Sequence, residues 1–153
     1  MLVGSLALAI GVAIYDLTVR ELDLSGTATQ SQYAIYAADT GTECALYWDF
    51  KCSLGPCTSG GANSAFATSS ESPVPLSGVM CNGQDVAPTW TKTATAAAAT
   101  TTFTVTFSPQ SYCVIVTVAK SGTPTLTTIT AKGYNSCAEA GVIRLERVLQ
   151  VTY

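Results

Sequence analysis

The pattern of apolar and polar positions separates a long apolar N-terminal segment from an alternating C-terminal part. Residues 1–15, MLVGSLALAIGVAIY, carry no charged side chain, and the apolar run continues through Leu17 and Val19 past a single acid, Asp16. About nineteen residues at ~1.5 Å each make a helix of roughly 28 Å, close to the thickness of the hydrocarbon core of a bilayer. The pattern therefore predicts an apolar helix over residues 1–24 that spans a membrane or fills the core of a filament.

The next segment is amphipathic and contains no proline up to residue 50. Small residues and one tryptophan recur in it at steps of three and four: Ala34, Ala37, Ala38, Gly41, Ala45 and Trp48. This spacing places them on one helical face. We expect residues 25–50 to continue the same helix. A break at Gly26 stays open, because the residues around it are mediocre helix formers.

Residues 51–153 are expected to form a small β domain. Turn signals such as Gly55-Pro56 and Gly60-Gly61 follow the helix, and strand signals dominate later. The predicted strands are Thr101–Ser108, Tyr112–Ala119, Thr125–Lys132 and Val142–Thr152. The predicted fold class is therefore α+β, with a long helix packed on a small antiparallel sheet that has one apolar face.

Composition argues against several functions. Only 11% of the residues are charged, the net charge is -3 and no basic patch exists, which speaks against nucleic-acid binding. Histidine, the commonest general base and metal ligand, is absent. The carboxylates are scattered; Asp39 and Glu43 share a helical face that fits solvent or a neighbouring chain better than acid–base chemistry. We expect no enzyme activity, no cofactor and no metal site.

The cysteines indicate export. Six are present, at Cys44, Cys52, Cys57, Cys81, Cys113 and Cys137. An even number in a small domain behind an export-type N-terminus predicts structural disulfides, whereas the spacing suits zinc poorly. Six cysteines allow fifteen connectivities. The preferred pairs are Cys52–Cys57, Cys113–Cys137 and Cys44–Cys81.

The apolar run carries small residues that allow close helix packing. Gly4 and Gly11 lie on stripes with Ser5 and several alanines. A generic membrane anchor and a helix that packs against its own copies explain them equally well. Asp16 and Arg20 stand four apart in the favourable order for a helical ion pair and mark the boundary of the run.

The threonine-rich run Thr89–Thr106 has two interpretations. Such tracts can carry O-linked sugars, but threonine also suits the exposed face of a strand. We favour the strand, because the same run contains the alternating residues of a predicted strand.

An apolar N-terminal helix without a basic flank, followed by an amphipathic half and a sheet, resembles a mature type IV pilin. The segment Gln30–Asp49 is similar to PilX-type pilins of ultrasmall, host-attached bacteria. Ala131–Cys137 and Arg144–Tyr153 are similar to the last strands of that group, whereas the middle, Cys52–Gln110, shows no such similarity. The residues of the first segment that carry the resemblance are Ser31, Ala34, Ala37, Ala38, Gly41, Glu43, Cys44 and Tyr47.

The resemblance implies a pilin fold and a structural role. A processed subunit would rest in the inner membrane, be extracted by pilus assembly machinery, and join identical subunits in a helical filament on the cell surface. Adhesion, with a host-cell surface as a partner, and twitching motility are the implied uses. The residues expected to act in the filament core are Met1, Gly4, Ser5, Gly11, Asp16 and Arg20.

One departure from the family bears on assembly. Most type IV pilins have a glutamate where this chain has Ser5 and a phenylalanine where it has Met1. In the family, that glutamate is thought to neutralise the α-amino group of an adjacent subunit. Asp16 is the only acid within the apolar run, so we hypothesise that it pairs with a neighbour's Met1 amine instead of with Arg20.

Other functions remain open at this point. The chain could be a minor or tip pilin that acts as an adhesive binding module, or a pseudopilin of a secretion system. It could also be a monomeric surface domain held by a signal anchor, in which case Gly4 and Gly11 would be incidental.

Overall fold

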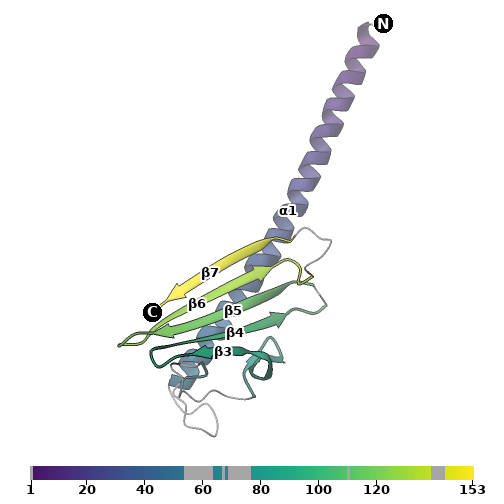
Figure 1. The fold of residues 1–153 in the computed structure, drawn as a ribbon. Coiled ribbons are helices and arrows are strands. Elements are labelled where there is room, and N and C mark those ends of the chain that lie inside the picture. The colour runs from purple at the N-terminus through teal and green to yellow at the C-terminus, as the bar shows by residue number, and fades with distance from the viewer. Residues whose placement is uncertain (1, 54–63, 67, 69–76, 110, 139–143) are drawn as a thin grey trace.

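In a computed structural model, the chain folds into a long helix packed on an antiparallel sheet (Figure 1). The structure describes residues 2–53, 64–66, 68, 77–109, 111–138 and 144–153. The helix α1 runs from Leu2 to Ser53. The main sheet has the order β3-β4-β5-β6-β7, with every neighbouring pair antiparallel. The α+β class predicted from the sequence is confirmed.

The strands alternate between an inner and an outer face, as a period of two requires. Their bounds are β3 Thr91–Ala94, β4 Ala98–Thr106, β5 Cys113–Ser121, β6 Leu126–Tyr134 and β7 Glu146–Thr152. A two-stranded ribbon, β1 Met80–Cys81 with β2 Gln84–Asp85, and a 3-10 turn, η1 Ala87–Thr89, precede them. The sequence predicts β4 to β7 within a few residues and misses the short β1, β2 and β3.

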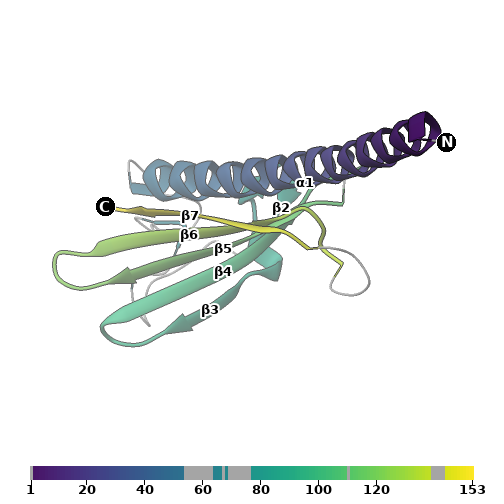
Figure 2. The ribbon, with the colours of Figure 1, turned by 90° about the horizontal axis from the view of Figure 1, so that it is seen from above.

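The sheet covers only the C-terminal part of α1. Figure 2 shows the helix lying across one face of the sheet, and Figure 1 shows its N-terminal half extending beyond the sheet. Ala34, Ala37, Ala38 and Ala45 are fully buried, so the predicted stripe of small residues is the packing face. Trp48, at the end of this stripe, is half-buried, and its indole N–H donates to the Met80 carbonyl at 3.0 Å.

Two glycines bring helix and sheet close together. A Cβ on Gly41 would lie 2.8 Å from methyl groups of Val114 and Val116 on β5. A Cβ on Gly133 of β6 would collide with the backbone of α1 at Ala34 and would lie 2.6 Å from the Ala38 nitrogen. Small residues on both surfaces therefore set the distance between α1 and the sheet.

The break at Gly26 does not occur, because α1 is helical throughout. The hydroxyls of Thr27 and Thr29 donate to the carbonyls of Asp23 and Ser25, so they are satisfied within the helix. The sequence also predicts that residues 1–24 span a membrane or fill the core of a filament. Among the residues that the structure describes, no helix has both the length and the apolar character needed to cross a bilayer. The predicted span is therefore not found there.

Two of the three preferred disulfides are present. Cys44 of α1 is bonded to Cys81 of β1, and Cys113 at the start of β5 is bonded to Cys137 beyond β6. The third expected pair, Cys52–Cys57, lies outside the part of the chain whose side chains are described. The two observed bonds attach the helix to the β1–β2 ribbon and close one end of the sheet.

Candidate functional site

The N-terminal half of α1 is an apolar surface that no other described part of the chain covers. Large apolar side chains lie exposed all around it: Val3, Leu8, Ile10, Val12, Ile14, Tyr15, Leu17, Leu22 and Leu24. Leu8 and Leu22 are each 73% exposed. Large contiguous apolar patches on a protein surface mark sites of interaction with proteins or membranes. We define residues 3–24 as the apolar stalk, and we take it as the candidate functional site.

The two glycines of the apolar stalk face open space. A Cβ added to Gly4 or Gly11 would meet no atom within 4 Å. In the single chain, therefore, neither glycine is needed for packing, unlike Gly41 and Gly133. The side chain of Ser5 and the whole of Met1 lie outside the described residues, so the structure does not show what either of them contacts.

Asp16 and Arg20 form the helical ion pair that their spacing predicts, with 3.1 Å between the carboxylate oxygen and the guanidinium nitrogen. Both side chains are mostly exposed, 64% for Asp16 and 75% for Arg20. Exposed ion pairs of this kind contribute about 0–1 kcal/mol. The pair adds little to the stability of the helix, and it holds the charge of Asp16 on the helix surface.

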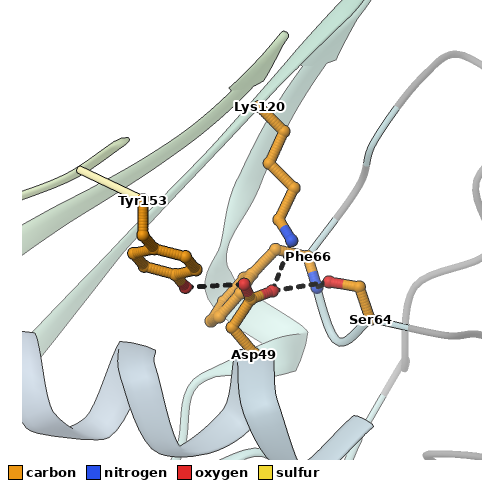
Figure 3. Close-up of polar contacts among 5 residues, drawn as sticks. All are labelled: Asp49, Ser64, Phe66, Lys120 and Tyr153. Carbon is orange, nitrogen blue, oxygen red and sulfur yellow. Dashed lines mark hydrogen bonds and ion pairs between the residues drawn. The ribbon is translucent and has the colours of Figure 1, made fainter. Parts of the chain in front are cut away.

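A second cluster lies at the opposite end of α1 (Figure 3). It consists of the buried residues Asp49, Ser64 and Lys120 and of Tyr153, which is 39% exposed. The Lys120 ammonium lies 2.5 Å from Oδ1 of Asp49, and both side chains are more than nine-tenths buried. The Ser64 hydroxyl donates to the same oxygen at 2.7 Å, and the Tyr153 hydroxyl donates to Oδ2 at 2.7 Å. We call these four residues the Asp49 cluster.

The Asp49 cluster connects separate parts of the fold. Asp49 comes from α1, Lys120 from β5 and Tyr153 from the residue after β7. The buried carboxylate of Asp49 accepts a hydrogen bond from each of the other three residues. The cluster therefore avoids the high free-energy cost of an unpaired buried charge. Burial, followed by the hydrogen bond and the charge of Asp49, raises the pKa of the Tyr153 hydroxyl above its usual value.

Sequence reasoning missed the Asp49 cluster, although two signals point to it. The inward alternation Val114, Val116 and Val118 continues to Lys120, so a period of two places this lysine on the apolar face. Asp49 follows Ala45 by four residues and therefore lies on the buried stripe of α1. A charged residue on each of two facing apolar surfaces indicates a buried pair.

A groove of about 890 Å³ lies where α1 leaves the sheet. Its walls are α1 residues from Leu22 to Tyr33 and the loops around Tyr112 and Asn135. The rings of Tyr33 and Tyr112 stack there with centroids 5.6 Å apart, and the Asn135 amide donates to Gln30 at 3.1 Å. These contacts fix the angle between the apolar stalk and the rest of the described chain. We call the described residues between 30 and 153 the head.

Within the described part of the chain, no three side chains of the histidine, cysteine, aspartate or glutamate type gather as metal ligands would. Comparisons with protein-family models, with curated proteins and with solved structures found no match. The fold and the site define the chain as an α+β protein. Its long helix is half buried on an antiparallel sheet and half exposed as an apolar stalk.

Proposed function

We propose that this chain is the structural subunit of a type IV pilus-like filament on the cell surface, with the apolar stalks of many copies packed as its core. The observation that carries the proposal is the contrast within α1: its C-terminal half is covered by the sheet, and its N-terminal half is covered by none of the described residues. The resemblance of Gln30–Asp49 to pilins supports the same role. Adhesion and motility are the uses that we infer for such a filament.

The energetics favour stalk packing between copies. Burying a large apolar side chain contributes about 1.5–3 kcal/mol, so the exposed side chains of the apolar stalk together offer tens of kcal/mol before entropy is counted. The glycines Gly4 and Gly11, which face open space in the single chain, then allow close approach of neighbouring helices. Helical symmetry repeats the same contacts at every subunit, as a head-to-tail interface does when it does not close into a ring.

The test compares two substitutions at one position. Gly11→Ala adds a single methyl group and should leave filaments at near wild-type abundance, whereas Gly11→Leu should reduce them at least tenfold. Thr104→Leu, on the exposed outer side of β4, is the control for added bulk. Cells carrying each variant are sheared, and the released material is imaged and identified by mass spectrometry.

Filaments composed mainly of this chain support the proposal. Filaments in which this chain is a trace component would instead indicate a minor or tip subunit. A wild-type protein that stays monomeric, with no filament in the sheared fraction, contradicts the proposal.

A further inference from the structure

We propose that Lys120 and Asp49 condense to an intramolecular amide bond, which joins β5 covalently to α1. The observations are the contact between the Lys120 nitrogen and Asp49 Oδ1 at 2.5 Å, the near-complete burial of both side chains, and the hydroxyls of Tyr153 and Ser64 on the carboxylate. The inference does not depend on the proposed function.

The surroundings of the pair favour a neutral product. The backbone N–H of Phe66 donates to the Ser64 hydroxyl at 3.1 Å (Figure 3), and Phe66 belongs to the apolar core together with Ala45 and Val118. A buried ion pair loses much of its attraction to the cost of desolvation. An amide carries no net charge, so its formation removes two charges from an apolar environment. The fold also holds the reacting groups together, and well-oriented groups reach effective molarities of about 10⁵–10⁸ M.

The reaction balances without an added reagent. The Lys120 ammonium gives one proton to Oδ1 of Asp49, which leaves an amine beside a carboxylic acid. The amine nitrogen then bonds to Cγ, and the electron pair of the C–Oδ2 double bond moves onto Oδ2. A second proton passes from nitrogen to Oδ1, the Cγ–Oδ1 bond breaks, and one water molecule leaves as the carbonyl forms again at Oδ2.

The two hydroxyls contact different oxygens of the Asp49 carboxylate and therefore have different roles in this reaction. Tyr153 donates to Oδ2, the oxygen on which negative charge develops, and therefore acts as an oxyanion donor. Burial and the neighbouring Asp49 raise the pKa of the Tyr153 hydroxyl, so it keeps its proton at neutral pH. Ser64 donates to Oδ1, the oxygen that leaves as water.

The bond would strengthen the junction between helix and sheet. Lys120 and Asp49 are separated by 71 positions in the sequence, and the Cys44–Cys81 disulfide joins α1 to a different element, β1. The amide would thus be a direct covalent connection from α1 to the main sheet, and it would survive reduction.

The experiment measures the intact mass of the full chain after reduction and alkylation in denaturant. We expect wild-type protein to be lighter than its sequence by the mass of one water molecule. Proteolysis should yield a branched peptide in which Lys120 is linked to Asp49, with no cleavage after Lys120. Lys120→Arg should restore the full sequence mass, and Lys92→Arg, at an exposed lysine on β3, should not.

Tyr153→Phe tests the assigned oxyanion donor. Followed over time in newly synthesised protein, this variant should form the branched peptide about a hundredfold more slowly than newly synthesised wild type, the usual effect of removing one oxyanion donor. Full sequence mass in wild-type protein overturns the proposal, because the pair is then an ion pair only. A loss of water located at any other residue overturns it as well.

Discussion

At the scale of single residues, Gly133 shows how closely β6 approaches α1. Gly133→Ala places a methyl group against the backbone at Ala34 and Ala38, which cannot move aside as a flexible side chain could. We expect a loss of about 1–3 kcal/mol or more in the free energy of unfolding, the usual range for overpacking. Denaturant unfolding of the two proteins measures it.

Gly26→Ala is the matched control for that substitution. Gly26 lies inside α1, and a Cβ there meets nothing within 4 Å. Alanine favours a helix over glycine by about 1 kcal/mol, so Gly26→Ala should leave stability unchanged or raise it. Equal destabilisation by both variants would show that the close contact at Gly133 is not the cause.

Tyr153 makes the stability of the head sensitive to alkaline pH. Burial, and then the hydrogen bond and charge of Asp49, raise the pKa of its hydroxyl. The contribution of this group is complete below about pH 10, its unfolded pKa, and is lost as the pH rises above that value toward the raised, folded-state pKa. Burial is the largest cause, so the direction holds after an amide forms at Asp49.

Tyr153→Phe should therefore lose less stability than wild type between about pH 9 and pH 11. Denaturant unfolding at several pH values measures the difference. Tyr36→Phe, at an exposed position on α1, is the control and should follow the wild-type curve. Parallel curves for wild type and Tyr153→Phe would contradict the assignment.

At the scale of elements, the Cys44–Cys81 disulfide holds α1 to the β1–β2 ribbon. The bond closes a separation of 37 residues, for which loop-closure entropy predicts a contribution of roughly 3–4 kcal/mol. Replacing both cysteines with alanine should lower the free energy of unfolding by about that amount. Urea unfolding under non-reducing conditions measures it.

The Cys113–Cys137 pair provides a comparison for this prediction. Its separation is 24 residues, so the same replacement should cost slightly less. An unchanged urea midpoint in the Cys44→Ala/Cys81→Ala protein would show that packing alone holds the ribbon to the helix.

Local patterns explain why most elements are predictable from the sequence. Alternation marks β4 to β7, and the three- and four-residue steps from Ala34 to Trp48 mark the buried face of α1. The strands β1, β2 and β3 contain two to four residues, too few to show a period. The contact of Asp49 with Lys120 depends on how α1 crosses the sheet, which no local pattern contains.

At the scale of the whole molecule, a substitution at Asp16 tests which contact joins neighbouring subunits of the filament. In the single chain it pairs with Arg20 on the surface of the apolar stalk. If it instead pairs with a neighbour's Met1 amine in the filament, Asp16→Asn should block assembly and change the stability of the monomer by less than about 1 kcal/mol. Counting filaments and measuring helix content separates the two effects.

Arg20→Gln is the control for this prediction, because it removes the same intrahelical pair and leaves the acid in place. This variant should still assemble. Normal filaments from Asp16→Asn would contradict the pairing between subunits.

The length of α1 has a mechanical consequence. The Gln30–Asn135 and Ser31–Arg147 hydrogen bonds are near the point where the sheet begins to hold the helix, so about 28 residues lie before it. At ~1.5 Å per residue they span roughly 42 Å as a helix. At ~3.4 Å per residue they span roughly 95 Å when extended. In a single chain outside a filament, a pulling force along α1 would therefore uncoil this part first, adding about 50 Å of reach while the head stays intact.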